Sequence, residues 1–284
     1  MISYRHHVVS LVAVFLALAV GVVLGGGPLS DLGRDDRAAA ASTAPAREAQ
    51  RTADFGDQFA AASASTLYGG RLADHGVAVV TMPGADPDTT AALSAEVSAA
   101  GGKVVGTYTA RAALTDPGQK ALVDTLGSQL MTTLEDAVDA DATTYERLGK
   151  LLALAATGDG ADAETVRESL AGAELVDPSK GAKPADVVLV ILGDHADPAI
   201  LAGLTTGLAA KAKGVVVGGD TRSGVSGGDL VALRADPDAD TVATVDGVDT
   251  ALGQVTATLA LIRSLTDPGG SFGASGSAGA VPLT

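Results

Sequence analysis

The chain has no cysteine and no tryptophan, and it is poor in aromatic and basic residues. Without cysteine it can form no disulfide, no thiolate metal site and no cysteine nucleophile. Its 19 lysines and arginines stand against 34 aspartates and glutamates, which gives a formal net charge of -15 at pH 7. Such a charge repels phosphate backbones, so we predict no nucleic-acid partner and regard cations as better candidates.

One long apolar run stands near the start of the chain. It extends from Val8 to about Gly27 without a charged residue, and it follows Arg5 and two histidines. A helix of roughly 20 residues crosses the ~30 Å hydrocarbon layer, and basic residues ahead of it favour a cytoplasmic N-terminus. We therefore predict that residues 1–27 form a single-pass anchor in the cell membrane. Residues 8–27 would contact lipid, and the C-terminal domain would be extracytoplasmic.

A cleaved signal sequence is the alternative for the same segment. Ala17-Leu18-Ala19 offers a small-x-small cleavage site after a short apolar stretch. Apolar sequence continues beyond that site through Leu24, which favours an anchor. If the leader is cleaved, the protein would be released towards the outer envelope.

Residues 28–70 are rich in alanine and polar side chains and contain Pro45. We predict a helical stalk or linker here. Apolar residues do not recur at the a and d positions of successive heptads, so a long coiled coil is not expected. A homo-oligomer held together by this stalk is correspondingly doubtful, although an oligomer or an envelope protein partner stays open.

Residues 71–265 alternate short valine-rich runs with amphipathic stretches, a pattern typical of an α/β domain with a Rossmann-like parallel sheet and flanking helices. The predicted strands are 77–81, 103–107, 187–192, 214–218 and 241–245. Asp-Pro pairs at residues 86, 116 and 197 predict helix starts, because Asp caps free amides and Pro tolerates the first helical position.

Three apolar stripes at helical spacing are expected to pack on the sheet. They consist of Leu122, Leu126, Leu130 and Leu134; of Ile200, Leu201, Leu204 and Leu208; and of Leu252, Val255, Leu259 and Ile262. Weaker helices are expected around residues 145–156 and 162–171. The tail, residues 266–284, is rich in Gly, Ser and Ala and is predicted to be disordered.

Potential metal ligands are few outside the N-terminal segment. His75 and His195 each follow an aspartate, but the first precedes a predicted strand and the second follows one. In a parallel sheet they lie at opposite edges, so a site shared by both is not expected. Neither a G-x-G-x-x-G after the first strand nor a G-x-x-x-x-G-K-[ST] is present. We predict no enzymatic activity and no resident cofactor.

The carboxyl ends of the strands offer a better candidate site, because ligands of open α/β sheets bind in the crevice beyond them. The loops after three predicted strands would bring together an acidic cluster with one imidazole and one thioether, able to hold a cation weakly. Its residues are Met82, Asp194, His195, Asp220 and Arg222. The alternative is structural: Gly218 and Gly219 make a turn, and Asp220 pairs locally with Arg222.

The first 25 residues carry a resemblance to a known family. The opening MISYRHH, then Ser10-Leu11 and the block VFLALAVGVVLG at residues 14–25, closely resemble the start of the mycobacterial copper transport protein B family of actinobacteria. Segments 76–84, 215–219 and 241–249 also fall where that family has equivalents. The Ala-rich stalk with Pro45 departs from the leucine-bearing coiled coil expected in the family.

The resemblance implies a membrane-anchored envelope protein that assists copper efflux and copper homeostasis, with a pore in the outer membrane. It makes copper ion a transported or weakly bound species. The residues argue against a barrel, because the predicted strands are short, continuously apolar and separated by helices. The alternative function is a non-catalytic envelope scaffold that binds a protein partner and transports no metal.

Overall fold

The computed structural model describes residues 14–15, 28–134 and 142–283. It divides into two compact units at the boundary between Gly56 and Asp57. Among the described residues, no helix is both long and apolar enough to cross a membrane. The predicted anchor 8–27 lies outside them, apart from Val14 and Phe15.

Helix α2 runs from Pro28 to Tyr68, with Pro45 inside it, where we expected a helical stalk. Its last turns differ from a stalk, because Ala60, Ala64 and Tyr68 are buried in the core of the second unit. These residues recur every four positions and line one face of the helix. Residues 57–68 therefore belong with the α/β domain, whose start we had placed at residue 71. Two of the three buried residues are alanines, and their weak hydrophobicity gives little indication in the sequence that this face of the helix is buried.

The second unit is built on a seven-stranded sheet with the order β3-β2-β1-β4-β5-β6-β7. Neighbouring strands are parallel except β2 and β3. The strands are β1 Gly76–Thr81, β2 Lys103–Ala110, β3 Val176–Pro178, β4 Val187–Ile191, β5 Gly214–Gly219, β6 Val242–Asp246 and β7 Ser271–Phe272. This confirms the parallel α/β sheet and the five predicted strands. The edge strands β3 and β7 were missed because they are too short to show an apolar run.

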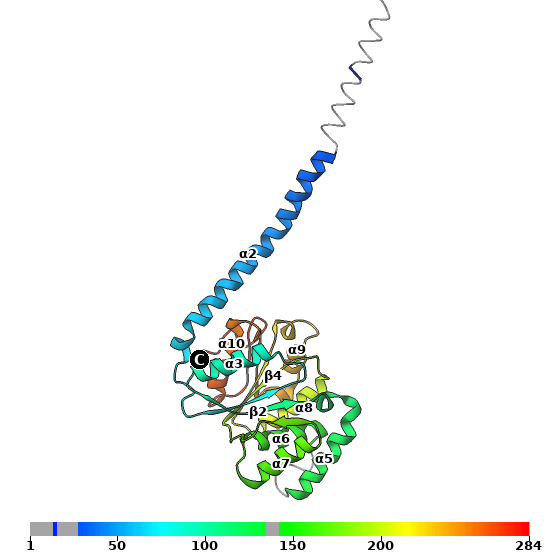
Figure 1. Ribbon diagram of the computed structural model, residues 1–284, viewed down its shortest axis with the longest axis vertical. Helices are drawn as coiled ribbons and strands as arrows, with labels where there is room; N and C mark the ends of the chain where they lie inside the picture. The colour runs from blue at the N-terminus through cyan, green and yellow to red at the C-terminus, as the bar shows by residue number, and fades with distance from the viewer. Residues whose placement is uncertain (1–13, 16–27, 135–141, 284) are drawn as a thin grey trace, which may run out of the picture. The chain divides into compact units, whose positions relative to one another are not determined.

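Helices cover both faces of the sheet, with α3 and α10 on one side and α6 and α8 on the other (Figure 1). Successive strand residues alternate between the faces: Val77 and Val79 pack with α3 and α10, whereas Ala78 and Val80 pack on the opposite side. The longer helices are α3 Pro87–Ala99, α5 Lys120–Thr133, α6 Thr144–Thr157, α7 Gly160–Gly172, α8 Pro198–Ala209 and α10 Ala251–Ser264.

The predicted helix starts are confirmed. Asp86 caps α3, Asp197 caps α8, and Asp116 caps the short 3-10 helix η1 (Pro117–Gln119). The apolar stripe of α8 is buried, but Leu122 of α5 and Leu252 of α10 are exposed. Helix α5 packs on α6 rather than directly on the sheet, which leaves its first turn in solvent.

The predicted disorder of the tail is wrong for the described residues 266–283. Strand β7 pairs with the end of β6, and Ser275 donates hydrogen bonds from its backbone N and its hydroxyl to the buried Asp246. Arg234, at the end of the short helix α9 (Asp229–Arg234), donates to Asp246 at 2.9 Å and to the carbonyl of Phe272 at 2.8 Å. These partners lie far apart in sequence, so composition could not show them.

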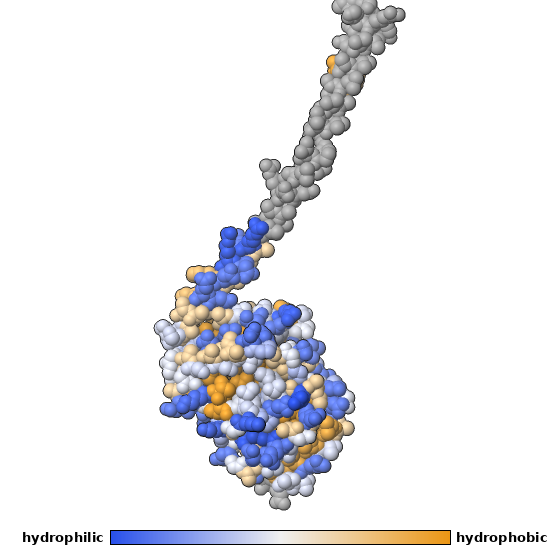
Figure 2. Space-filling view, in the orientation of Figure 1, coloured by the Kyte–Doolittle hydropathy of each residue, from blue (hydrophilic) through white to orange (hydrophobic). Residues whose placement is uncertain are grey.

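The surface matches the acidic composition. Figure 2 shows hydrophilic side chains spread over the visible face of the α/β unit, with smaller hydrophobic patches between them. With a formal net charge of -15, such a surface attracts cations and repels anionic ligands.

Candidate functional site

The chain reverses direction across the sheet between β1 and β4, which places the topological switch point beyond their carboxyl ends. The two loops there contact each other closely. The backbone N of Asp194 donates to the carbonyl of Pro83 at 2.7 Å, and a Cβ placed on Gly193 would lie 2.1 Å from the N of Ala85. Loop packing therefore fills the gap at the switch point.

An open cavity of about 440 Å³ lies one strand further along, between the loops that follow β4 and β5. Its lining residues are Gly193, Asp194, His195, Asp220, Arg222, Ser223, Ser226, Gly227, Gly228 and Asp229. The structure thus brings together four of the five residues singled out from the sequence, namely Asp194, His195, Asp220 and Arg222.

Met82 does not line this cavity. Its backbone N donates to the carbonyl of Ile191 at 2.9 Å, which extends the pairing of β1 with β4, and its side chain is 5% exposed within the apolar core. The expected thioether ligand is therefore part of the packing beneath the loops. Sequence position alone could not show that the β-ladder continues through this residue.

Asp220 and Arg222 form the local pair that the structural alternative predicts. Asp220 accepts from Nε of Arg222 at 2.9 Å and from the N and hydroxyl of Ser223, and it caps the 3-10 helix η2 (Thr221–Gly224). Burial raises the pKa of Asp220, but these hydrogen bonds outweigh burial and hold it below its usual value. The Arg222 side chain is 92% exposed. Asp220 is therefore committed to shaping the loop.

His195 is the one imidazole in the lining of the cavity. Its side chain is 70% exposed, and Nδ1 contacts Oδ1 of Asp229, a residue buried at the start of α9. The second oxygen of Asp229 accepts from the backbone N of Ala196 at 3.3 Å. The imidazole thus lies against a buried carboxylate on its Nδ1 side, and most of the rest of the ring is exposed.

His75 lies at the opposite edge of the sheet, as expected. It precedes β1, and its Nδ1 lies 3.3 Å from Oδ2 of Asp186, which also pairs with Lys213 at 2.5 Å. The two histidines therefore cannot share one ion. Across the described residues, no group of three or more His, Cys, Asp or Glu side chains is arranged to hold a metal.

Sequence reasoning missed Asp229 and the serines of the cavity. Asp229 stands 34 residues after His195, and no motif joins them. Residues 224–228 read G-V-S-G-G, which matches the G-x-S-x-G spacing of a nucleophile elbow. However, Ser226 follows the 3-10 helix η2 and not the end of a strand, so it lacks the strand-to-helix turn that the elbow requires.

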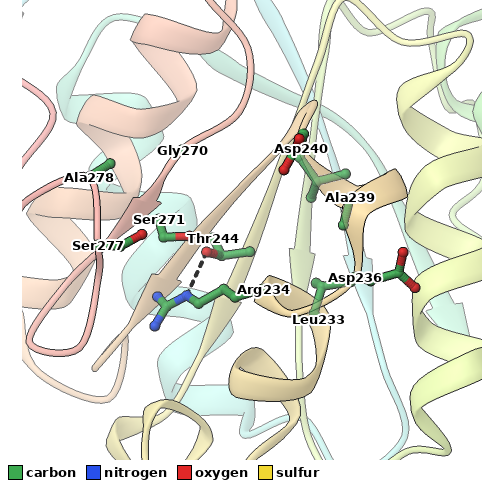
Figure 3. A pocket seen from close by; sticks show the side chains of 11 residues that line it. Leu233, Arg234, Asp236, Ala239, Asp240, Thr244, Gly270, Ser271, Ser277 and Ala278 are labelled. Atoms are coloured by element: carbon green, nitrogen blue, oxygen red, sulfur yellow. Dashed lines mark hydrogen bonds between the residues drawn. The ribbon is translucent and has the colours of Figure 1, made fainter.

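A second cavity, of about 350 Å³, lies between α9, β6 and the tail. Figure 3 shows Arg234 and Thr244 on its wall, joined by a hydrogen bond of 2.8 Å. The guanidinium also donates to Ser275, Asp246 and Phe272. Because these partners occupy most of its N–H groups, Arg234 ties the tail to the sheet and offers little to a ligand.

Comparison with known proteins gives a consistent result along the chain. The family model described as "Copper transport outer membrane protein, MctB" matches residues 1–283. The copper transporter MctB of Mycobacterium bovis is 30% identical over 292 residues, and that of Mycobacterium leprae is 31% identical over 300 residues. Each match covers 92% of this chain and 92% of the relative. The chain therefore belongs to the MctB family of copper transport outer membrane proteins.

Proposed function

We propose that this protein takes part in copper efflux and copper homeostasis in the cell envelope. The observation that carries the proposal is the extent of the family match, which includes the apolar N-terminal segment, α2 and the α/β unit. Two relatives named copper transporters cover 92% of the chain, so the proposal does not depend on one shared domain.

Residues 8–27 would hold the protein in the membrane, with the N-terminus cytoplasmic and the α/β unit extracytoplasmic. The absence of charge from Val8 to Gly27 and the basic residues before it support this topology. A reporter enzyme fused after Thr284 should be active on the extracytoplasmic side. Activity confined to the cytosol would reject the topology, and N-terminal sequencing of the mature protein separates an anchor from a cleaved leader.

The role would be non-catalytic. The open cavity beyond β4 and β5 holds carboxylates and one imidazole, which are ligands for a cation, and its serine loop is not built as a nucleophile elbow. Because the loop lies on a rigid sheet, it can present these groups to an ion that passes along the envelope.

A deletion strain tests the proposal. Loss of the gene should lower copper tolerance and raise cell-associated copper, and the wild-type gene should restore both. Unchanged tolerance and unchanged copper content in the deletion strain would reject a role in copper homeostasis.

An envelope scaffold that binds a protein partner, with no direct metal transport, is the second candidate. It is favoured by the lack of a three-ligand metal cluster in the described part of the chain. Normal copper tolerance combined with a defect in envelope assembly would support the scaffold. Co-purification of one defined envelope protein at fixed stoichiometry would identify its partner.

A further inference from the structure

The chain carries two Asp-His dipeptides, and their surroundings differ. At Asp194-His195, the imidazole lies against the buried Asp229, whose side chain is 8% exposed. Among the described residues, Oδ1 of Asp229 receives no hydrogen bond from any other group. A carboxylate in this position favours the proton on Nδ1 and leaves the lone pair of Nε2 directed away from the protein interior.

From this geometry we infer that His195 is a Cu(II) ligand through Nε2, with Asp229 as the residue that orients it and Asp194 as the neighbouring oxygen donor. The inference rests on the proposed function in copper transport and names the form of copper that the cavity binds. Metal-bound histidines commonly place a carboxylate on their second ring nitrogen, which fixes the ring and raises its basicity.

The donor set selects Cu(II) over Cu(I). Imidazole and carboxylate suit Cu(II), whereas Cu(I) prefers thiolate or thioether. The chain has no cysteine, and Met82 is buried in the core below the cavity. Among divalent first-row ions, such a site binds Cu(II) most tightly, ahead of both Ni(II) and Zn(II).

The site is open and sparsely liganded. His195 is 70% exposed, Asp220 is already bound to Arg222 and Ser223, and three protein donors do not converge. Water must complete the coordination, so the ion exchanges quickly. A contact of this kind serves the passage of copper and not its storage.

His75 provides a matched control within the same chain. Its partner Asp186 also pairs with Lys213 and accepts from the backbone N of Gly76 at 3.1 Å, so that carboxylate is already neutralised. The His75 side chain is also only half as exposed as that of His195, at 36% against 70%. Both His75 and His195 follow an aspartate in the sequence, but their surroundings in the structure differ.

The test is a Cu(II) titration of the full chain in detergent, followed by electron paramagnetic resonance. The background is the H6Q/H7Q variant, which removes the histidines of the N-terminal segment. We expect a Cu(II) signal with one imidazole nitrogen. H195A should abolish it, whereas H75A should leave it unchanged.

The D229N variant tests whether Asp229 orients His195, because it changes the orienting residue and keeps the proposed ligand in place. It should weaken Cu(II) binding by about tenfold while the one-nitrogen signal persists, because losing such a partner typically costs 10- to 100-fold in metal affinity. Thermal unfolding of each variant verifies that the fold is retained. A signal that survives H195A, or that H75A removes to the same extent, would overturn the assignment.

Complementation separates this inference from the proposed function. If the deletion strain is copper-sensitive and H195A restores tolerance as well as wild type, copper homeostasis stands and the His195 site is wrong. If the deletion has no copper phenotype, the proposed function fails whatever His195 binds.

Discussion

His75 and His195 lie at opposite edges of the sheet, and each contacts an aspartate, but their surroundings differ. At the amino edge, the Asp186 carboxylate pairs with Lys213 at 2.5 Å, accepts from the backbone N of Gly76, and lies 3.3 Å from Nδ1 of His75. At the carboxyl edge, the buried Asp229 holds His195 from below and leaves its outer nitrogen open. An Asp-His dipeptide therefore has no fixed role. The side chains packed around it decide whether it closes a network or presents a ligand.

The carboxyl edge depends most strongly on Arg234. In R234A, Asp246, whose side chain is 1% exposed, would stay buried and lose the guanidinium that pairs with it. Removing one member of a buried ion pair costs roughly 3–5 kcal/mol. Urea unfolding should show a loss of this size, together with release of the tail.

Arg222 is the matched control at the same edge, because its guanidinium is exposed and pairs with Asp220 in solvent. R222A should change the free energy of unfolding by less than about 0.5 kcal/mol. Equal effects of R234A and R222A would show that the tail is not held by the Asp246 network.

Adding a side chain where the loops after β1 and β4 meet should have the next largest effect on the free energy of unfolding. A Cβ at Gly193 would lie 2.1–2.3 Å from backbone atoms of residues 83–85, so G193A forces the two loops apart. Overpacking of this kind costs about 1–3 kcal/mol. G172A is the control, since a Cβ at Gly172 meets no atom within 4 Å. Chemical denaturation should separate the two variants, and equal stabilities would contradict the close loop contact.

The contacts at the amino edge should contribute least to the free energy of unfolding, and their contribution should depend on pH. Burial raises the pKa of Asp186, but hydrogen bonds from Lys213, the backbone N of Gly76 and His75 outweigh burial and lower it. A carboxylate with a lowered pKa stabilises the fold above its unfolded pKa of about 3.9, and that stability is lost as pH falls through the folded pKa.

K213A tests this directly. Because Lys213 is largely exposed, its removal should cost at most about 1 kcal/mol at pH 7, and less in high salt. The difference from wild type should vanish once acid protonates Asp186 in both proteins. A difference that persists unchanged at low pH would assign the effect of Lys213 to packing.

Much of the fold could be predicted from local patterns. Continuous apolar runs such as residues 187–191 identify strands buried on both faces, and Asp-Pro pairs identify helix starts. The order of crossovers then places Asp194, His195, Asp220 and Arg222 at one edge. Their grouping around a cavity follows from topology and needs no knowledge of side-chain contacts.

The tail shows where local patterns fail. Its Gly- and Ser-rich composition is typical of disorder, yet Ser275 and Phe272 bind a buried Asp246–Arg234 pair. The prediction for Met82 was also wrong. Met82 follows the predicted strand 77–81 in sequence, but its backbone still pairs with β4 in the ladder. Both outcomes depend on partners that come from distant segments.

By itself, the sequence determined the class of the protein: an apolar N-terminal segment, an acidic α/β domain, and no cysteine chemistry. These properties are sums over the composition or short-range patterns, so each segment shows them before the chain folds. Only the tertiary structure decided that Asp229 meets His195, that Met82 is buried, and that the tail completes the sheet. Each of these is a contact between residues remote in the chain, and burial and charge at such a contact exist only after the chain has folded.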